Sequence, residues 1–249
     1  MGFDLAAFIA RLREAETPPP WPVRTGLALW LAYLVIRIVA LAGVSMAVDA
    51  EAAALGMLSP AVMNLAMIVA ALVTLGLILL VVRRYTALAG STVTGLLRLG
   101  RYSGSILLLI LAALGAAMLI DFVQLLAGTI VLPVNLQGLA AGNMAGWLLA
   151  GAYMVLFGPL VETLLLQGVL YPVLAVNRDN LVALLFTALL FMLLRVFDNP
   201  VSPVLWVESF LTGVFITGVR AHQKSTRSAL IAAVMIGVFT LYKGLRLLL

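Results

Sequence analysis

Seven long apolar runs restrict the fold of this chain more than any other feature. They lie at about 23–48, 60–82, 104–127, 145–174, 181–197, 202–219 and 228–248. About 20 apolar residues in a helix cross the hydrocarbon core of a bilayer, where only helices and closed barrels satisfy the backbone polar groups. The sequence therefore predicts an all-α, polytopic transmembrane helical bundle of about seven spans. The fifth and sixth runs flank Asp198-Asn199-Pro200, which predicts a tight helical hairpin.

The composition excludes a soluble domain and a nucleic-acid-binding protein. Hydrophobic residues make up 64% of the 249 residues and charged residues only 10%. The formal net charge is +5, but the Lys and Arg residues lie in short loops between apolar runs, as expected for signals of membrane topology. Because there is no cysteine, disulfides and thiolate metal sites are excluded. The expected partner is the lipid bilayer, not nucleic acid.

The first 20 residues are expected to lie outside the transmembrane domain, which we place at 21–249. Residues 3–15 have apolar side chains at helical spacing opposite charged ones, which favours an N-terminal amphipathic helix on the membrane surface. A Pro-rich linker, Pro18-Pro19-Pro20, follows. A frayed polar tail is the alternative for this segment.

The basic residues predict the orientation, because short cytoplasmic loops carry an excess of Lys and Arg. If seven spans start in the cytoplasm, nearly all basic residues fall on that side: Arg11, Arg13, Arg24, Arg83, Arg84, Arg98, Arg101, Arg178, Arg220, Lys224 and Arg227. We therefore expect an integral protein of a bacterial inner membrane with a cytoplasmic N-terminus. An eighth helix or a re-entrant segment, for which the Gly- and Asn-rich loop 132–146 is a candidate, would move the C-terminus to the other side.

Charged side chains also fall inside the predicted spans. They are Arg37, Asp121, Glu162, Arg195 and Glu208. An ionised side chain at bilayer depth costs roughly 2.5–3.5 kcal/mol on insertion scales, so each indicates a functional site and needs a partner. The helical rise places Glu162, Arg195 and Glu208 in one layer near the midplane, with Arg195 between the two carboxylates or paired with one of them. Alternatively, Arg195 snorkels to the outer surface. Whether Arg37 pairs with Asp121 stays open.

The segment around Glu162 reads Pro159-Leu-Val-Glu162-Thr163-Leu-Leu-Leu166-Gln167-Gly168. It resembles the first motif, P-x-x-E-E-x-x-F-R-G, of the CPBP family of intramembrane endopeptidases (CAAX protease and bacteriocin-processing, or Abi). The proline, the first glutamate and the glycine match this motif. Thr163 stands in place of the second glutamate, and Gln167 in place of the arginine.

Three later segments are similar to further parts of the same family. Phe191-Met-Leu-Leu-Arg195 resembles an F-x-x-x-H motif with Arg195 at the histidine, and Ser209 to Gly218 resembles the small-residue helix that follows. The run from Ser228 resembles the approach to a second histidine, but this chain has Ile236 there and Phe239 where an asparagine is usual. The resemblance covers about residues 145–240 and implies a CAAX-protease-like bundle.

In the family, two glutamates and two histidines bind or activate the attacking water, with a divalent metal. Of these groups only Glu162 is retained here, so it is the candidate catalytic residue. The candidates for a degenerate or binding site are Thr163, Gln167, Arg195 and Glu208. Arg195 would repel a cation, and the single histidine, His222, is expected in a basic loop away from the required position. The sequence therefore predicts no metal and no other cofactor.

These substitutions predict a proteolytically inactive member of the family. We expect a membrane-embedded binding, assembly or chaperone-like protein, with a membrane protein or peptide as its partner. One alternative is an active endopeptidase with Glu162 as general base. Another is a proton-coupled transporter that uses Glu162, Arg195 and Glu208, although no internal repeat is visible. The oligomeric state stays open.

Overall fold

The structure is a computed structural model, and it describes residues 10, 16–48, 50, 58–100, 104–137, 139, 143–199 and 201–248. In these residues there is no strand, and seven helices are long and apolar enough to cross a membrane. They are α2 (Val23–Val48), α4 (Pro60–Ala89), α6 (Ile106–Leu126), a composite helix over Met144–Asn177, α10 (Asn180–Asp198), α11 (Pro203–Gln223) and α12 (Thr226–Leu248). The predicted all-α bundle of about seven spans is confirmed. The predicted surface helix at 3–15 lies almost wholly outside the described residues.

Local capping defines where the helices begin and end. Ser59 accepts a hydrogen bond from the backbone N–H of Val62 (3.3 Å), Pro60 occupies the first turn of α4, and Gly90 ends that helix in the left-handed conformation. Ser105 and Asp179 cap α6 and α10 in the same way, at 3.4 and 2.8 Å. The helix ends therefore follow from short-range sequence signals, which is why the predicted spans lie close to the observed ones.

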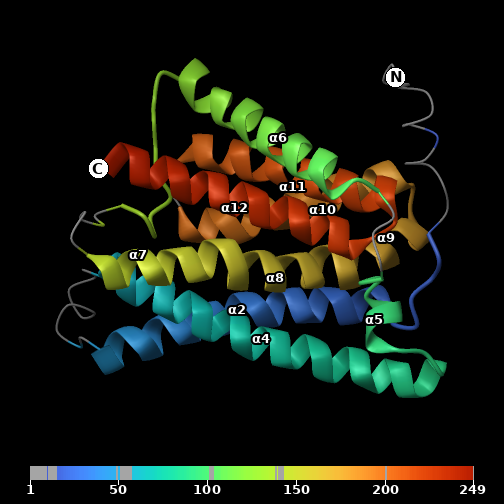
Figure 1. Cartoon of the computed structure of the whole chain (residues 1–249). Coiled ribbons are helices and arrows are strands. Elements are labelled where there is room, and N and C mark those ends of the chain that lie inside the picture. The colour runs from blue at the N-terminus through green and yellow to red at the C-terminus, as the bar shows by residue number, and fades with distance from the viewer. Residues whose placement is uncertain are drawn as a thin grey trace.

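The helices lie side by side, with the composite helix between two groups (Figure 1). On one side α2 packs against α4, and on the other α10, α11, α12 and α6 pack together. The hairpin of α10 and α11 is present as predicted, and Gly213 lets these helices approach closely: a Cβ there would lie 2.9 Å from Cα of Ala188. This arrangement leaves the composite helix as the central element of the bundle.

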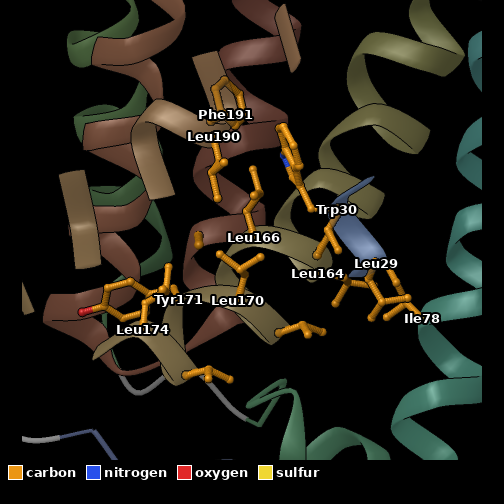
Figure 2. Packing of buried hydrophobic residues seen from close by; sticks show 14 of the residues in the cluster. Leu29, Trp30, Ile78, Leu164, Leu166, Leu170, Tyr171, Leu174, Leu190 and Phe191 are labelled. Carbon is orange, nitrogen blue, oxygen red and sulfur yellow. The ribbon is translucent and has the colours of Figure 1, made fainter. Parts of the chain in front are cut away.

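The composite helix switches from α-helical to π-helical hydrogen bonding twice. It consists of α7 (Met144–Gly151), the π-helical η1 (Ala152–Phe157), α8 (Gly158–Thr163), the π-helical η2 (Leu164–Leu170) and α9 (Tyr171–Asn177). Leu164, Leu166 and Leu170 of η2 pack in the main core with α2, α4 and α10 side chains, including Trp30, Ile78 and Phe191 (Figure 2). Such π-helical turns are frequent at functional sites. Here they bracket α8, the short segment that carries Glu162.

A buried charge cluster holds the N-terminal segment against the end of the bundle near α9. Glu16 pairs with Arg98, with Arg220 at 3.1 Å and with Lys224 at 3.7 Å, and the side chains of Glu16 and Arg220 are fully buried. The sequence-based assignment of Arg220 and His222 to a loop is wrong, because α11 continues to Gln223 and both residues are helical. The carboxylate of Glu16 supplies the partner that lets α11 carry a buried arginine.

Candidate functional site

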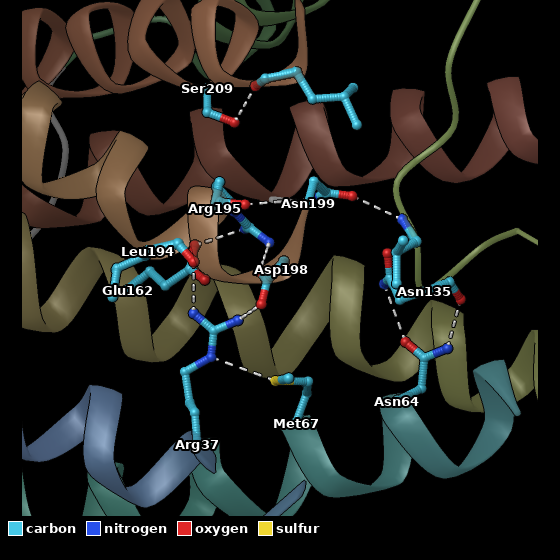
Figure 3. Close-up of polar contacts among 12 residues, drawn as sticks. Arg37, Asn64, Met67, Asn135, Glu162, Leu194, Arg195, Asp198, Asn199 and Ser209 are labelled. Atoms are coloured by element: carbon cyan, nitrogen blue, oxygen red, sulfur yellow. Dashed lines mark hydrogen bonds and ion pairs between the residues drawn. The ribbon is translucent and has the colours of Figure 1, made fainter. Parts of the chain in front are cut away.

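Glu162 forms an ion pair with Arg195 in the interior of the bundle. Glu162 is only 2% exposed, and Nη2 of Arg195 donates to its Oε2 at 2.7 Å. The prediction that Arg195 pairs with one of the two carboxylates is confirmed, and the snorkelling alternative is wrong because the guanidinium points inward to Glu162 (Figure 3). The pair joins α8 to α10.

Arg37 of α2 and Asp198 at the end of α10 extend this pair into a network. Arg37 pairs directly with Asp198 and donates to the backbone carbonyl of Leu194 at 3.1 Å, while Nη1 of Arg195 lies 3.7 Å from Asp198. Two guanidinium groups and two carboxylates thus alternate across three helices (Figure 3). The open question of Arg37 and Asp121 is answered: Arg37 pairs with Asp198, a residue that the sequence suggested only as part of a turn.

Glu208 belongs to a second network and not to the pair of Arg195. Its Oε2 accepts from Nε2 of Gln124 at 3.0 Å. Lys243 of α12 pairs with Asp121 and donates to Oε1 of Gln124 at 3.0 Å. Of the two arrangements proposed for Arg195, the one with the guanidinium between both carboxylates is therefore wrong.

The three predicted charges nevertheless lie at one depth along their helices. Glu162, Arg195 and Glu208 are each fifteen residues from Asn177, Asn180 and Gln223, the helix ends on the side of the Glu16 cluster. Fifteen residues correspond to roughly 22 Å of helical rise, against a hydrocarbon core of about 30 Å. The layer is shared, as predicted, but it lies beyond the middle of the bundle, near the turn between α10 and α11.

A cavity of about 160 Å³ connects the two networks. Thr163 lines it with Glu162, Arg195 and Glu208, whereas Gln167 does not. Gln167 is 1% exposed and donates to Oγ1 of Thr217 at 3.0 Å, between η2 and α11. The structure therefore brings four of the five predicted site residues together and assigns Gln167 to helix packing.

The loop after α6 forms one wall of this cavity. Val131 exchanges hydrogen bonds with the side chain of Gln124 at 2.8 and 2.9 Å, and the N–H of Val134 donates to Asn199 at 2.9 Å. Asn64 and Asn135 exchange two further bonds, at 2.9 and 3.1 Å (Figure 3). These side chains from α6, α4 and the α10–α11 turn hold the loop across the bundle. The predicted loop 132–146 ends earlier in the structure, because α7 begins at Met144.

Residues 144–242 match a family model described as type II CAAX prenyl endopeptidase Rce1-like. The chain carries a CAAX protease family domain. This match confirms the resemblance drawn from the motifs at about 145–240. No curated protein and no solved structure matches the chain. The CAAX protease domain supplies Glu162, Arg195 and Glu208, whereas Arg37, Asp121 and Gln124 come from helices outside the matched residues.

The residues at the site do not fit the divalent metal of active CAAX proteases. In the part of the chain that the structure describes, no three His, Cys, Asp or Glu side chains are placed to hold a metal ion. Ile236 and Phe239, at the positions that resemble a histidine and an asparagine, line the cavity with apolar side chains. The Arg195 guanidinium pairs with Oε2 of Glu162, the one carboxylate retained from the first motif.

Proposed function

We propose that this protein is a proteolytically inactive member of the CAAX-protease-like superfamily, which uses the retained cavity to bind a partner inside the membrane. The observation that carries the proposal is the 2.7 Å ion pair between Arg195 and Glu162, at the position of the catalytic groups of the family. The partner class that we propose is a membrane protein or peptide, as the sequence predicts.

The ion pair argues against both roles of a catalytic glutamate. A general base must accept a proton from water, but one oxygen of Glu162 already accepts a charge-assisted hydrogen bond from Arg195. A metal ligand must face a metal ion, but the group that faces Glu162 is the positively charged guanidinium of Arg195, which repels a metal ion. Removing one member of a buried ion pair leaves the other charge without a partner, which is costly. Arg195 and Glu162 therefore stabilise each other, and neither group is free for hydrolytic chemistry.

The cavity supports the binding part of the proposal. Its walls come from α4, α6, α8, α10, α11 and α12, and its charged groups are held in place by the two networks described above. If the N-terminus is cytoplasmic, as the basic residues predict, the cavity lies in the outer half of the bilayer. A partner would then reach it from that side or laterally from the lipid.

The test combines metal analysis with a peptidase assay on the purified full-length protein. We expect no stoichiometric zinc and no cleavage of membrane-embedded peptides by the wild type, the Glu162→Gln variant or the control. The control is Asp179→Asn, which makes the same change from carboxylate to amide at an exposed helix cap. Zinc bound in a 1:1 ratio and cleavage, both lost only in Glu162→Gln, would refute the proposal.

A further inference from the structure

Glu208 differs from the other carboxylates that line the cavity. Asp121 has Lys243 as its cation, Glu162 has Arg195, and Asp198 has Arg37 and Arg195. The described residues provide no cation within 4.0 Å of Glu208, whose hydrogen-bond donor is the neutral Gln124. With every other cavity charge matched, the ionised site carries one uncompensated negative charge.

Three residues of the cavity also have buried polar atoms without a hydrogen-bond partner among the described residues. They are Oε1 of Glu162, Oε1 of Glu208 and the hydroxyl of Tyr153. Glu162 and Tyr153 are each 2% exposed, so bulk water does not cover them. Buried polar groups in folded proteins nearly always have partners, and an unsatisfied carboxylate oxygen is especially unfavourable. Each of these atoms is free to accept a hydrogen bond from a ligand in the cavity.

We propose that the cavity binds a monovalent organic cation through an ammonium group that pairs with Glu208. This inference rests on the proposed binding function and names its ligand class: an amine, free or borne by a peptide. An ammonium has three donors and no acceptor, which suits the unpartnered carboxylate oxygen of Glu208. Its single charge equals the charge that Glu208 leaves unmatched, whereas a divalent metal lacks a third ligand in the described residues.

The size and lining of the cavity limit the body that carries the ammonium. The volume of about 160 Å³ is close to that of an engineered cavity of about 150 Å³ that holds benzene. Met67, Phe191, Ile216, Ile236 and Phe239 supply apolar walls, and a ring face stabilises a nearby cation. The fitting ligand therefore has an apolar body about the size of one aromatic ring next to its ammonium group.

The test compares benzylammonium with benzyl alcohol, which has nearly the same shape but no charge. Both are titrated at neutral pH into the full-length protein in lipid nanodiscs, with binding measured by calorimetry. We expect benzylammonium to bind the wild type about tenfold more tightly than benzyl alcohol, because a hydrogen bond to a charged group is worth at least that factor. In Glu208→Gln we expect this difference to disappear, while Asp179→Asn retains it.

Three outcomes would overturn the inference. They are equal affinity of the wild type for the two compounds, an unchanged preference in Glu208→Gln, and displacement of benzylammonium by millimolar sodium or potassium, which would make an inorganic ion the ligand. The wild-type comparison does not depend on the folding of any variant. Failure here leaves the metal analysis and the peptidase assay untouched, so it is distinguishable from failure of the proposed function.

Discussion

Replacing Arg195 by methionine tests whether the ion pair holds the centre of the bundle together. The change keeps most of the side-chain volume but leaves Glu162, at 2% exposure, without its cation. Breaking a buried pair from one side costs about 3–5 kcal/mol. Since the Arg195 side chain is 27% exposed and Arg37 still holds Asp198, we expect the lower end, about 3 kcal/mol, in the free energy of unfolding.

The double variant Glu162→Gln, Arg195→Met shows whether the destabilisation by Arg195→Met comes from the lost ion pair or from lost side-chain packing. With both charges removed, we expect the destabilisation to fall to about 1 kcal/mol, because a neutral pair leaves no buried charge. The free energy of unfolding is measured by denaturant titration in mixed micelles. Arg83→Met, at an exposed site on α4, should change it by no more than about 0.5 kcal/mol. The reasoning is refuted if the destabilisation of the double variant equals the sum of the effects of Glu162→Gln and Arg195→Met measured separately, within about 0.5 kcal/mol.

Two further predictions concern packing and the N-terminal segment. Gly213→Ala should destabilise the bundle by about 1–3 kcal/mol, because its Cβ would lie 2.9 Å from Cα of Ala188. Gly218→Ala is the control on the same helix, with its nearest neighbour at 4.0 Å, and a similar loss of thermal stability in both variants would contradict the argument. Glu16→Gln should lower the free energy of unfolding by about 3 kcal/mol, because it leaves the fully buried Arg220 without its anion. Adding Arg220→Met should restore most of that loss, and no recovery in the same titration would show that Glu16 acts in another way.

The sequence predicted the spans and the central pair because both depend on short-range or motif information. Apolar run lengths and capping residues set the helices, and the motif segments placed Glu162 and Arg195 on helices of one domain. The shared depth of Glu162, Arg195 and Glu208 followed from helical rise alone. These features required no knowledge of how the helices pack laterally.

The remaining contacts of the site could not be predicted because they depend on lateral packing. Asp198 has the sequence signature of a turn, and only the approach of α2 makes it the partner of Arg37. Lys243 resembles a tail residue until α12 is placed beside α6, where it meets Asp121. Gln124 carries no charge and gave no signal, yet it links Lys243 to Glu208. A buried amide among the apolar residues of a span was the one sign that could have identified it.

The two π-helical stretches divide the central helix into parts that can change independently. A π turn holds about one residue more than the α-helical turn that it replaces. Deleting one residue from η1 would let it close into an ordinary α-helical turn, while α7 and α8 keep their rotation relative to each other. Deleting one from η2 would likewise keep α8 and α9 in register. Insertions and deletions on either side of Glu162 can thus be absorbed without turning its carboxylate away from the cavity.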